Sequence, residues 1–107
     1  MGEIFVQRDG SNRIVGVAIH DISADTAVGK AVLGYLQTVA ESLTTYLHVP
    51  VVGGTADDFG LAVDRADLHL DRELDAILET LVIGLRLLET RFPGEMTVHE
   101  ATVGVEV

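Results

Sequence analysis

The chain of 107 residues contains no cysteine. Disulfide bonds, thiolate metal sites and a cysteine nucleophile are therefore all excluded. Any metal ligand would have to be a histidine or a carboxylate. The protein is left with imidazole, hydroxyl and carboxylate chemistry, or with binding alone.

Positively charged residues are also scarce. Seven lysine and arginine residues stand against seventeen aspartate and glutamate residues, so the formal net charge is −10 at pH 7. A surface of this sign repels a phosphate backbone and an anionic lipid surface. We therefore expect no nucleic-acid or membrane partner, whereas a basic ribosomal protein or a cationic peptide suits the charge.

Long apolar runs are missing as well. None reaches the roughly 18 residues that a membrane span needs, because Arg86 interrupts the longest candidate. The N-terminus has no basic region followed by an apolar stretch and a small-residue cleavage site. The length and the 48% hydrophobic content suit one domain with a modest core. We expect a single cytoplasmic domain over residues 1–107, with no cofactor.

The first half of the chain predicts a β-hairpin followed by a helix. The segments Glu3 to Gln7 and Arg13 to His20 are rich in β-branched residues and flank a turn cluster. From about Asp25 to Leu47, apolar residues recur at steps of three and four, and Pro50 is expected to end this helix. Its apolar face is Val28, Val32, Tyr35, Leu36, Val39, Leu43, Tyr46 and Leu47.

The second half predicts another hairpin, a helix and a strand. Val51-Val52 and Phe59 to Val63 flank a glycine-rich turn from Gly53 to Asp58, and Met96 to Val107 alternates as a strand does. With the helix between them, the element order is ββαββαβ. This order predicts an α+β fold, a two-layer sandwich with two helices on one face of a mostly antiparallel sheet.

The second helix carries more apolar surface than a one-sided helix needs. Acidic residues from Asp67 to Asp71 suit its start, and it should run to about Arg91. The region of Leu81, Ile83 and Leu87 therefore predicts a contact between two copies, although deeper burial within one copy would explain the same pattern. Its core face is Leu74, Ile77, Leu78, Leu81, Val82, Leu85 and Leu88.

Three strings of residues carry a resemblance to a known family. They are Ala27-Val28-Gly29-Lys30-Ala31-Val32-Leu33-Gly34-Tyr35-Leu36-Gln37-Thr38, then Ala76-Ile77-Leu78-Glu79-Thr80-Leu81-Val82-Ile83-Gly84-Leu85, then Phe92-Pro93-Gly94-Glu95-Met96-Thr97-Val98. Together they resemble the ribosomal-processing cysteine protease family, Prp (YsxB-like), over about residues 3 to 100. The resemblance implies a homodimer. In active members it also implies that a His–Cys dyad removes an N-terminal extension from a large-subunit ribosomal protein.

The resemblance fails at the nucleophile. It puts the family histidine at His20 and the family cysteine at Gly29, which has no side chain to attack a peptide bond. Ile19 and Asp21 replace the residues that flank the family histidine, and the segment from His20 to Gly29 is shorter than in the family. The resemblance therefore implies a homologue without cysteine protease activity, acting as a homodimeric binding or assembly protein.

The candidate binding residues are His20, Asp21, Ser23, Gly29 and Lys30. A carboxylate next to a histidine can handle protons, and a helix start can receive an anion, but a surface turn and a close-packing glycine explain both features as well. Two alternatives remain open: an enzyme of different chemistry that reuses the pocket around His20, and a purely structural dimeric module. A His20 ring that faces solvent would count against chemistry.

An acidic set precedes the second helix. Asp64, Asp67, His69 and Asp71 offer oxygen and nitrogen ligands, but their spacing matches neither a calcium loop nor a zinc pattern. They predict a solvated helix start with no metal.

Overall fold

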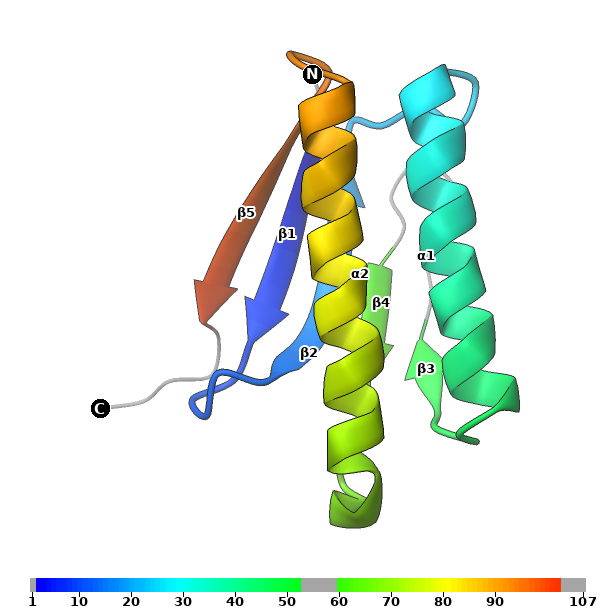
Figure 1. The fold of residues 1–107 in the computed structure, drawn as a ribbon, viewed down its shortest axis with the longest axis vertical. Coiled ribbons are helices and arrows are strands. Elements are labelled where there is room, and N and C mark those ends of the chain that lie inside the picture. Colours follow the sequence, from blue (N-terminus) through cyan, green and yellow to red (C-terminus); the bar gives the residue numbers. More distant parts are fainter. Residues whose placement is uncertain (1, 53–59, 103–107) are drawn as a thin grey trace.

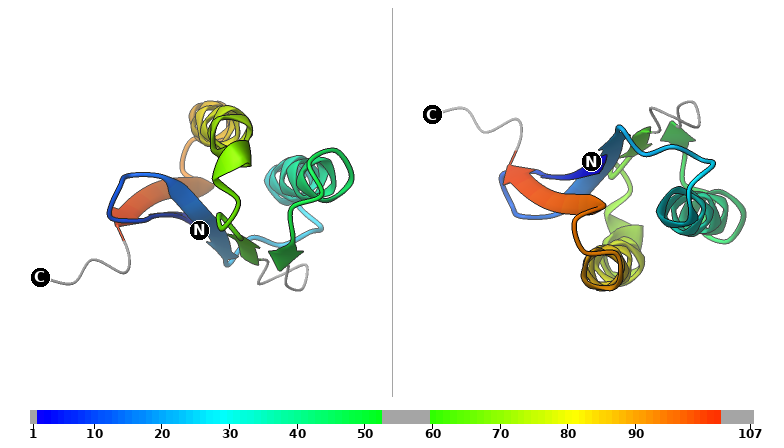
Figure 2. Two further views of the ribbon diagram at one scale, coloured as in Figure 1. Left: turned by 90° about the horizontal axis from the view of Figure 1, so that it is seen from below. Right: turned by 90° about the horizontal axis from the view of Figure 1, so that it is seen from above.

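The computed structural model describes residues 2–52 and 60–102. Two helices cover one face of a sheet, which confirms the predicted α+β two-layer class (Figure 1 and Figure 2). The predicted turn from Gly53 to Asp58 and the part of the last strand beyond Thr102 lie outside the described residues.

The described elements follow the predicted order. The strand order across the sheet is β3-β4-β2-β1-β5. β1 and β5 are parallel, and the other neighbouring pairs are antiparallel, so the sheet is mixed but mostly antiparallel. The elements are β1 (Gly2–Arg8), β2 (Ile14–His20), α1 (Ala27–Thr45), β3 (Val51–Val52), β4 (Gly60–Val63), a 3₁₀ turn (Leu68–Leu70), α2 (Asp71–Arg91) and β5 (Met96–Thr102).

The two faces of the sheet differ because strand side chains alternate. Ile4 of β1 lies opposite Ile19 of β2, both are fully buried, and they face the helices. Phe5 lies between the buried positions Ile4 and Val6 of β1 and pairs with Ala18, so strand alternation places it on the opposite face of the sheet. The helices leave that face uncovered (Figure 2). His20 and His99 contact Phe5 on that uncovered face.

The end of α1 differs from the prediction. The helix stops at Thr45, because the backbone of His48 turns into the left-handed region at φ 58° and the amide of Val49 donates to the carbonyl of Leu43 at 2.9 Å. This turn buries Val49 in the core. The prediction that Pro50 ends the helix is wrong. Tyr46, which was predicted for the core face, is 77% exposed because it lies beyond the last turn.

The start of α2 also shifts relative to the prediction. The segment Leu68–Leu70 forms a separate 3₁₀ turn, capped by the Asp67 carboxylate, which accepts the amide of His69 at 3.0 Å. The α-helix proper begins at Asp71, with Asp71 and Glu73 in its first turn, where negative charge suits the helix dipole.

The predicted contact between two copies is wrong for one of its three residues, Leu81. Leu81 is fully buried in the core, so a second copy cannot reach it. Ile83 and Leu87 are 64% and 56% exposed, as a contact surface requires. On the α1 side of α2, Gly84 leaves room for the ring of Tyr35, whose hydroxyl donates to the carbonyl of Thr80 at 3.0 Å.

A buried arginine ties the first hairpin to α2. The side chain of Arg65 is 5% exposed and donates from Nε to the carbonyl of Ile14 at 2.7 Å. Its two terminal nitrogens each donate to a carboxylate at 2.8 Å, one of Asp71 and one of Asp75. Arg13 adds a second guanidinium at Asp71. The linker between β4 and α2 is therefore held in place by directed hydrogen bonds.

A second network joins α2 to the β1 and β5 strands. Arg8 donates to both carboxylate oxygens of Glu79 at 2.7 and 3.1 Å, and to Glu100 at 2.9 Å. Arg86 donates to the other oxygen of Glu100 at 2.7 Å. Paired hydrogen bonds from guanidinium to carboxylate fix direction as well as charge, so both Glu79 and Arg86 are oriented by their neighbours.

Because of these two networks, we expect the free energy of unfolding to fall in acid. Burial alone would raise the pKa of the Asp71 carboxyl, but hydrogen bonds from Arg13 and Arg65 outweigh it and hold that pKa below its usual range. Hydrogen bonds from Arg86 and Arg8 do the same for the pKa of Glu100. Such carboxyls stabilise the fold while ionised, and this contribution is lost as the pH falls through their folded-state pKa. We expect urea unfolding midpoints to fall progressively below about pH 4. A midpoint unchanged at pH 3 would contradict this.

Candidate functional site

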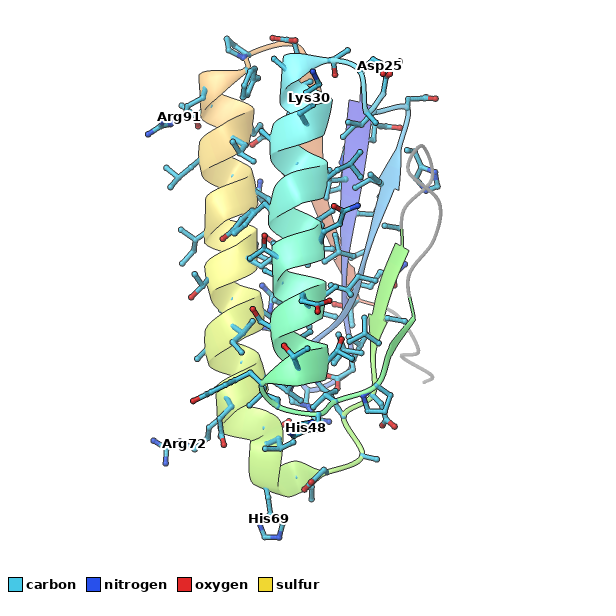
Figure 3. The ribbon with its side chains drawn as sticks, turned by 90° about the vertical axis from the view of Figure 1, so that its right-hand side faces the viewer. Asp25, Lys30, His48, His69, Arg72 and Arg91 are labelled. Atoms are coloured by element: carbon cyan, nitrogen blue, oxygen red, sulfur yellow. The ribbon has the colours of Figure 1, made fainter. Side chains whose placement is uncertain are left out.

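The predicted site residues follow one another from the end of β2 into the first turn of α1. Figure 3 shows Asp25 and Lys30 at one end of the molecule, the end where Arg91 closes α2, whereas His48, His69 and Arg72 lie at the opposite end. The candidate site is therefore built on one end of the two-layer fold.

The loop before α1 folds back on itself. The carbonyl oxygen of Ser23 accepts hydrogen bonds from the amide of Thr26 at 3.3 Å and from its hydroxyl at 2.9 Å. The same Thr26 hydroxyl accepts the amide of Gly29 at 3.0 Å, and the Thr26 carbonyl accepts the amide of Lys30 at 2.9 Å. The start of the helix is capped in this way by its own chain. The amides of Gly29 and Lys30 therefore already have acceptors and are not available to bind an anion.

Gly29 lies where the loop touches the helix. A Cβ atom built on Gly29 would overlap the carbonyl oxygen of Ser23 and would lie 2.6 Å from its carbonyl carbon and 2.9 Å from the Thr26 hydroxyl oxygen. The obstacle is backbone, which cannot rotate away as a side chain can. The position that the resemblance gives to the family cysteine is therefore filled by the loop, and a glycine there permits the close approach.

His20 lies on the other side of the sheet from Gly29. Its side chain is exposed, and the ring packs edge-on against Phe5 with centroids 5.5 Å apart. This contact is on the face that the helices leave uncovered, whereas Gly29 is buried in α1. The neighbouring Asp21 adopts a left-handed backbone at φ 58°. The His20 ring therefore does not share a face of the sheet with Gly29, and its exposure counts against an enzyme that reuses this pocket.

The sequence did not single out Phe5, Glu3 or His99. Phe5 stacks on His99 with centroids 4.9 Å apart, and Nε2 of His99 lies 3.3 Å from Oε1 of Glu3. Strand alternation could have put Phe5 and His20 on one face. The approach of His99 depends on the parallel pairing of β5 with β1, which no local pattern indicates.

The acidic residues before α2 have local structural roles. A carboxylate oxygen of Asp64 accepts the amide of Ala66 at 2.8 Å, and Asp67 and Asp71 have the partners given above. Within residues 2–52 and 60–102, no group of three or more histidine or acidic side chains is arranged to hold a metal ion. No helix in the same part of the chain is long and apolar enough to cross a bilayer.

Comparison with known proteins finds the same fold in a ribosomal processing protease. No family model and no curated protein sequence matches the chain. The structure of the essential ribosomal processing protease Prp from Staphylococcus aureus, in complex with a substrate peptide, matches with a TM-score of 0.80 at 12% identity, covering 94% of this chain and all of that one. The same protease with a covalently linked product peptide matches equally well.

Two further solved structures have this fold. A hypothetical protein from Staphylococcus aureus matches with a TM-score of 0.73 at 12% identity, over 94% of this chain and all of that one. A Streptococcus mutans protein matches with a TM-score of 0.72 at 13% identity, over 95% of both chains. The resemblance to Prp is therefore confirmed at the level of the fold, and the chain lacks the cysteine that the resemblance assigns to active members.

Proposed function

We propose that the protein is a non-catalytic homologue of the Prp protease that acts in the cytoplasm as a homodimeric binding or assembly protein. The observation that carries the proposal is the contact between the Ser23 carbonyl and Gly29, which occupies the place of a nucleophile with backbone. In this proposal the protein has no sulfur atom at the nucleophile position, and the Ser23 carbonyl lies where such a side chain would begin.

A basic protein or peptide is the partner that the charge favours. The net charge is −10, and Asp21 and Asp25 are exposed beside the proposed binding residues His20, Ser23, Gly29 and Lys30. A protease of the same fold was solved with a substrate peptide, which supports peptide binding by this scaffold. Exposed charge pairs steer a partner and set its orientation more than they add affinity. A purely structural dimer remains the second candidate, because the capped helix start leaves no amide free at Gly29 or Lys30.

The peptide proposal predicts a charge-dependent affinity. Calorimetric titration with a synthetic basic peptide, taken from the N-terminal segment of a large-subunit ribosomal protein, is expected to show binding that weakens as salt rises. Asp21→Asn removes one charge and retains a residue type that tolerates the left-handed backbone, so it should weaken binding roughly two- to fivefold.

A matched control is Glu73→Gln, which removes the same charge from an exposed position in the first turn of α2. It should leave the affinity unchanged. Equal losses in both variants would mean that the peptide responds to overall charge alone. No heat of binding with any variant would leave the structural dimer as the better account.

A further inference from the structure

The outward face of α2 carries an uncharged seam. Five exposed residues follow one another at alternating steps of four and three, namely Ala76, Thr80, Ile83, Leu87 and Thr90. This spacing is the heptad pattern by which two helices pack side by side. An uncharged stripe along an acidic protein, with two large apolar side chains at its centre, is a surface suited to another helix.

The neighbouring surface of α1 is also poor in charge. The hydroxyls of Thr38, Ser42 and Thr45 each donate to the carbonyl four residues earlier, so they present mainly carbon atoms outward. A hollow of about 940 Å³ runs between the two helices, with Glu41 as its one charged lining residue and Ile77 as its wall on α2. The helical layer thus offers a groove beside the seam of α2.

Two charges flank the seam on the side of α2 that faces β5. Glu79 and Arg86 stand one heptad apart, and each side chain is 45% exposed. Arg8 and Glu100 hold them in place by the hydrogen bonds described above. A two-fold axis across the helix would bring Arg86 of each copy to Glu79 of the other, so the face is complementary to itself.

We propose that two copies pair through α2 in antiparallel orientation, with Thr80 of each copy opposite Ile83 of the other. The inference rests on the homodimer of the proposed function and adds its interface and register. Ala76 of each copy then lies opposite Leu87 of the other, so Ala76, Thr80, Ile83 and Leu87 form one continuous uncharged core. Thr90, at the end of the seam, lies opposite Glu73 of the other copy.

The flanking charges disfavour the competing arrangements. In an antiparallel pair, a slip of one heptad in either direction brings Glu79 to Glu79 or Arg86 to Arg86 of the second copy. A parallel pair brings Arg86 to Arg91 of the second copy. Each of these alternatives sets like charges side by side, whereas the proposed register pairs opposite charges twice.

The absence of native cysteine makes the register directly testable. Thr80→Cys and Ile83→Cys proteins are purified separately, mixed and oxidised mildly. Cross-linking is then read on a non-reducing gel and by mass spectrometry. The proposed register predicts a disulfide-linked heterodimer as the main product, because residues opposite each other are within disulfide reach. Homodimers of Ile83→Cys as the main product would indicate a parallel pair and overturn the proposal.

A second variant tests whether a dimer forms at all, independently of the register of its two helices. Ile83→Glu should convert the dimer into a folded monomer in analytical ultracentrifugation, because the side chain is 64% exposed and contributes little to the fold. Ala66→Glu adds the same charge on an exposed linker and should leave the dimer intact. A wild-type protein that is monomeric at high micromolar concentration overturns both the dimer and its register. A dimer that survives Ile83→Glu without the mixed disulfide overturns the register alone.

Discussion

Gly29→Cys is expected to yield no protease and a less stable protein. The new Cβ would overlap the carbonyl oxygen of Ser23, so the loop that caps α1 must move before the side chain fits. Overpacking of this kind typically costs about 1–3 kcal/mol in the free energy of unfolding. Replacing a helical glycine offsets only about 0.3 kcal/mol of this, because cysteine is a weaker helix former than alanine. The thiol would also lack the imidazole, because the His20 ring lies against Phe5 on the uncovered face of the sheet.

Gly34→Ala is the matched control for this prediction. It changes another glycine of the same helix, at a position where nothing lies within 4 Å of a new Cβ. Urea unfolding should show Gly34→Ala stabilised by about 0.5–1 kcal/mol and Gly29→Cys destabilised. A Gly29→Cys protein at least as stable as wild type, with a thiol that alkylates rapidly and cleaves the ribosomal peptide, would mean that the site is open and intact.

Arg65→Met should destabilise the fold by about 2–3 kcal/mol. The change leaves the carbonyl of Ile14 without its buried donor and removes one cation from Asp71 and Asp75. The loss should stay below the roughly 3–5 kcal/mol seen when a fully buried ion pair is broken, because the Asp71 and Asp75 side chains are 27% and 44% exposed.

Arg72→Met is the control for Arg65→Met. It removes an arginine from an exposed position one turn before Asp75, and should shift the stability by no more than about 0.5 kcal/mol. Arg65→Lys separates charge from geometry, since an ammonium cannot reproduce the three directed hydrogen bonds of the guanidinium. Unfolding midpoints for Arg65→Met and Arg72→Met that coincide would show that the buried network adds nothing to stability.

The fold could be predicted from the sequence because its signals are local. Period-two runs give β1 and β2, and steps of three and four give both helices. The end of α1 was misplaced because a left-handed turn at His48 depends on burying Val49, a tertiary gain that the position of Pro50 does not indicate. Leu81 was predicted both for the core face and for the contact between copies, because apolar character alone fits either place, and its full burial leaves only the core face.

The candidate site was less accessible to prediction. Its residues could be named from the sequence, but the direction of the His20 ring follows from the register of β2 on β1. The contact between Ser23 and Gly29 follows from backbone geometry in a loop shorter than the family pattern. The role of Arg65 could not be predicted, because nothing in the sequence indicates that an arginine in a polar linker is buried.

Whether this protein binds a peptide without cleaving it can be read by mass spectrometry of a candidate substrate. Stoichiometric wild-type protein is incubated overnight with the ribosomal-protein N-terminal peptide, beside a sample without protein. We expect an intact peptide in both, since the nucleophile position is filled by backbone and His20 lies on the other face of the sheet. A peptide cut at one bond only in the presence of the protein would contradict it.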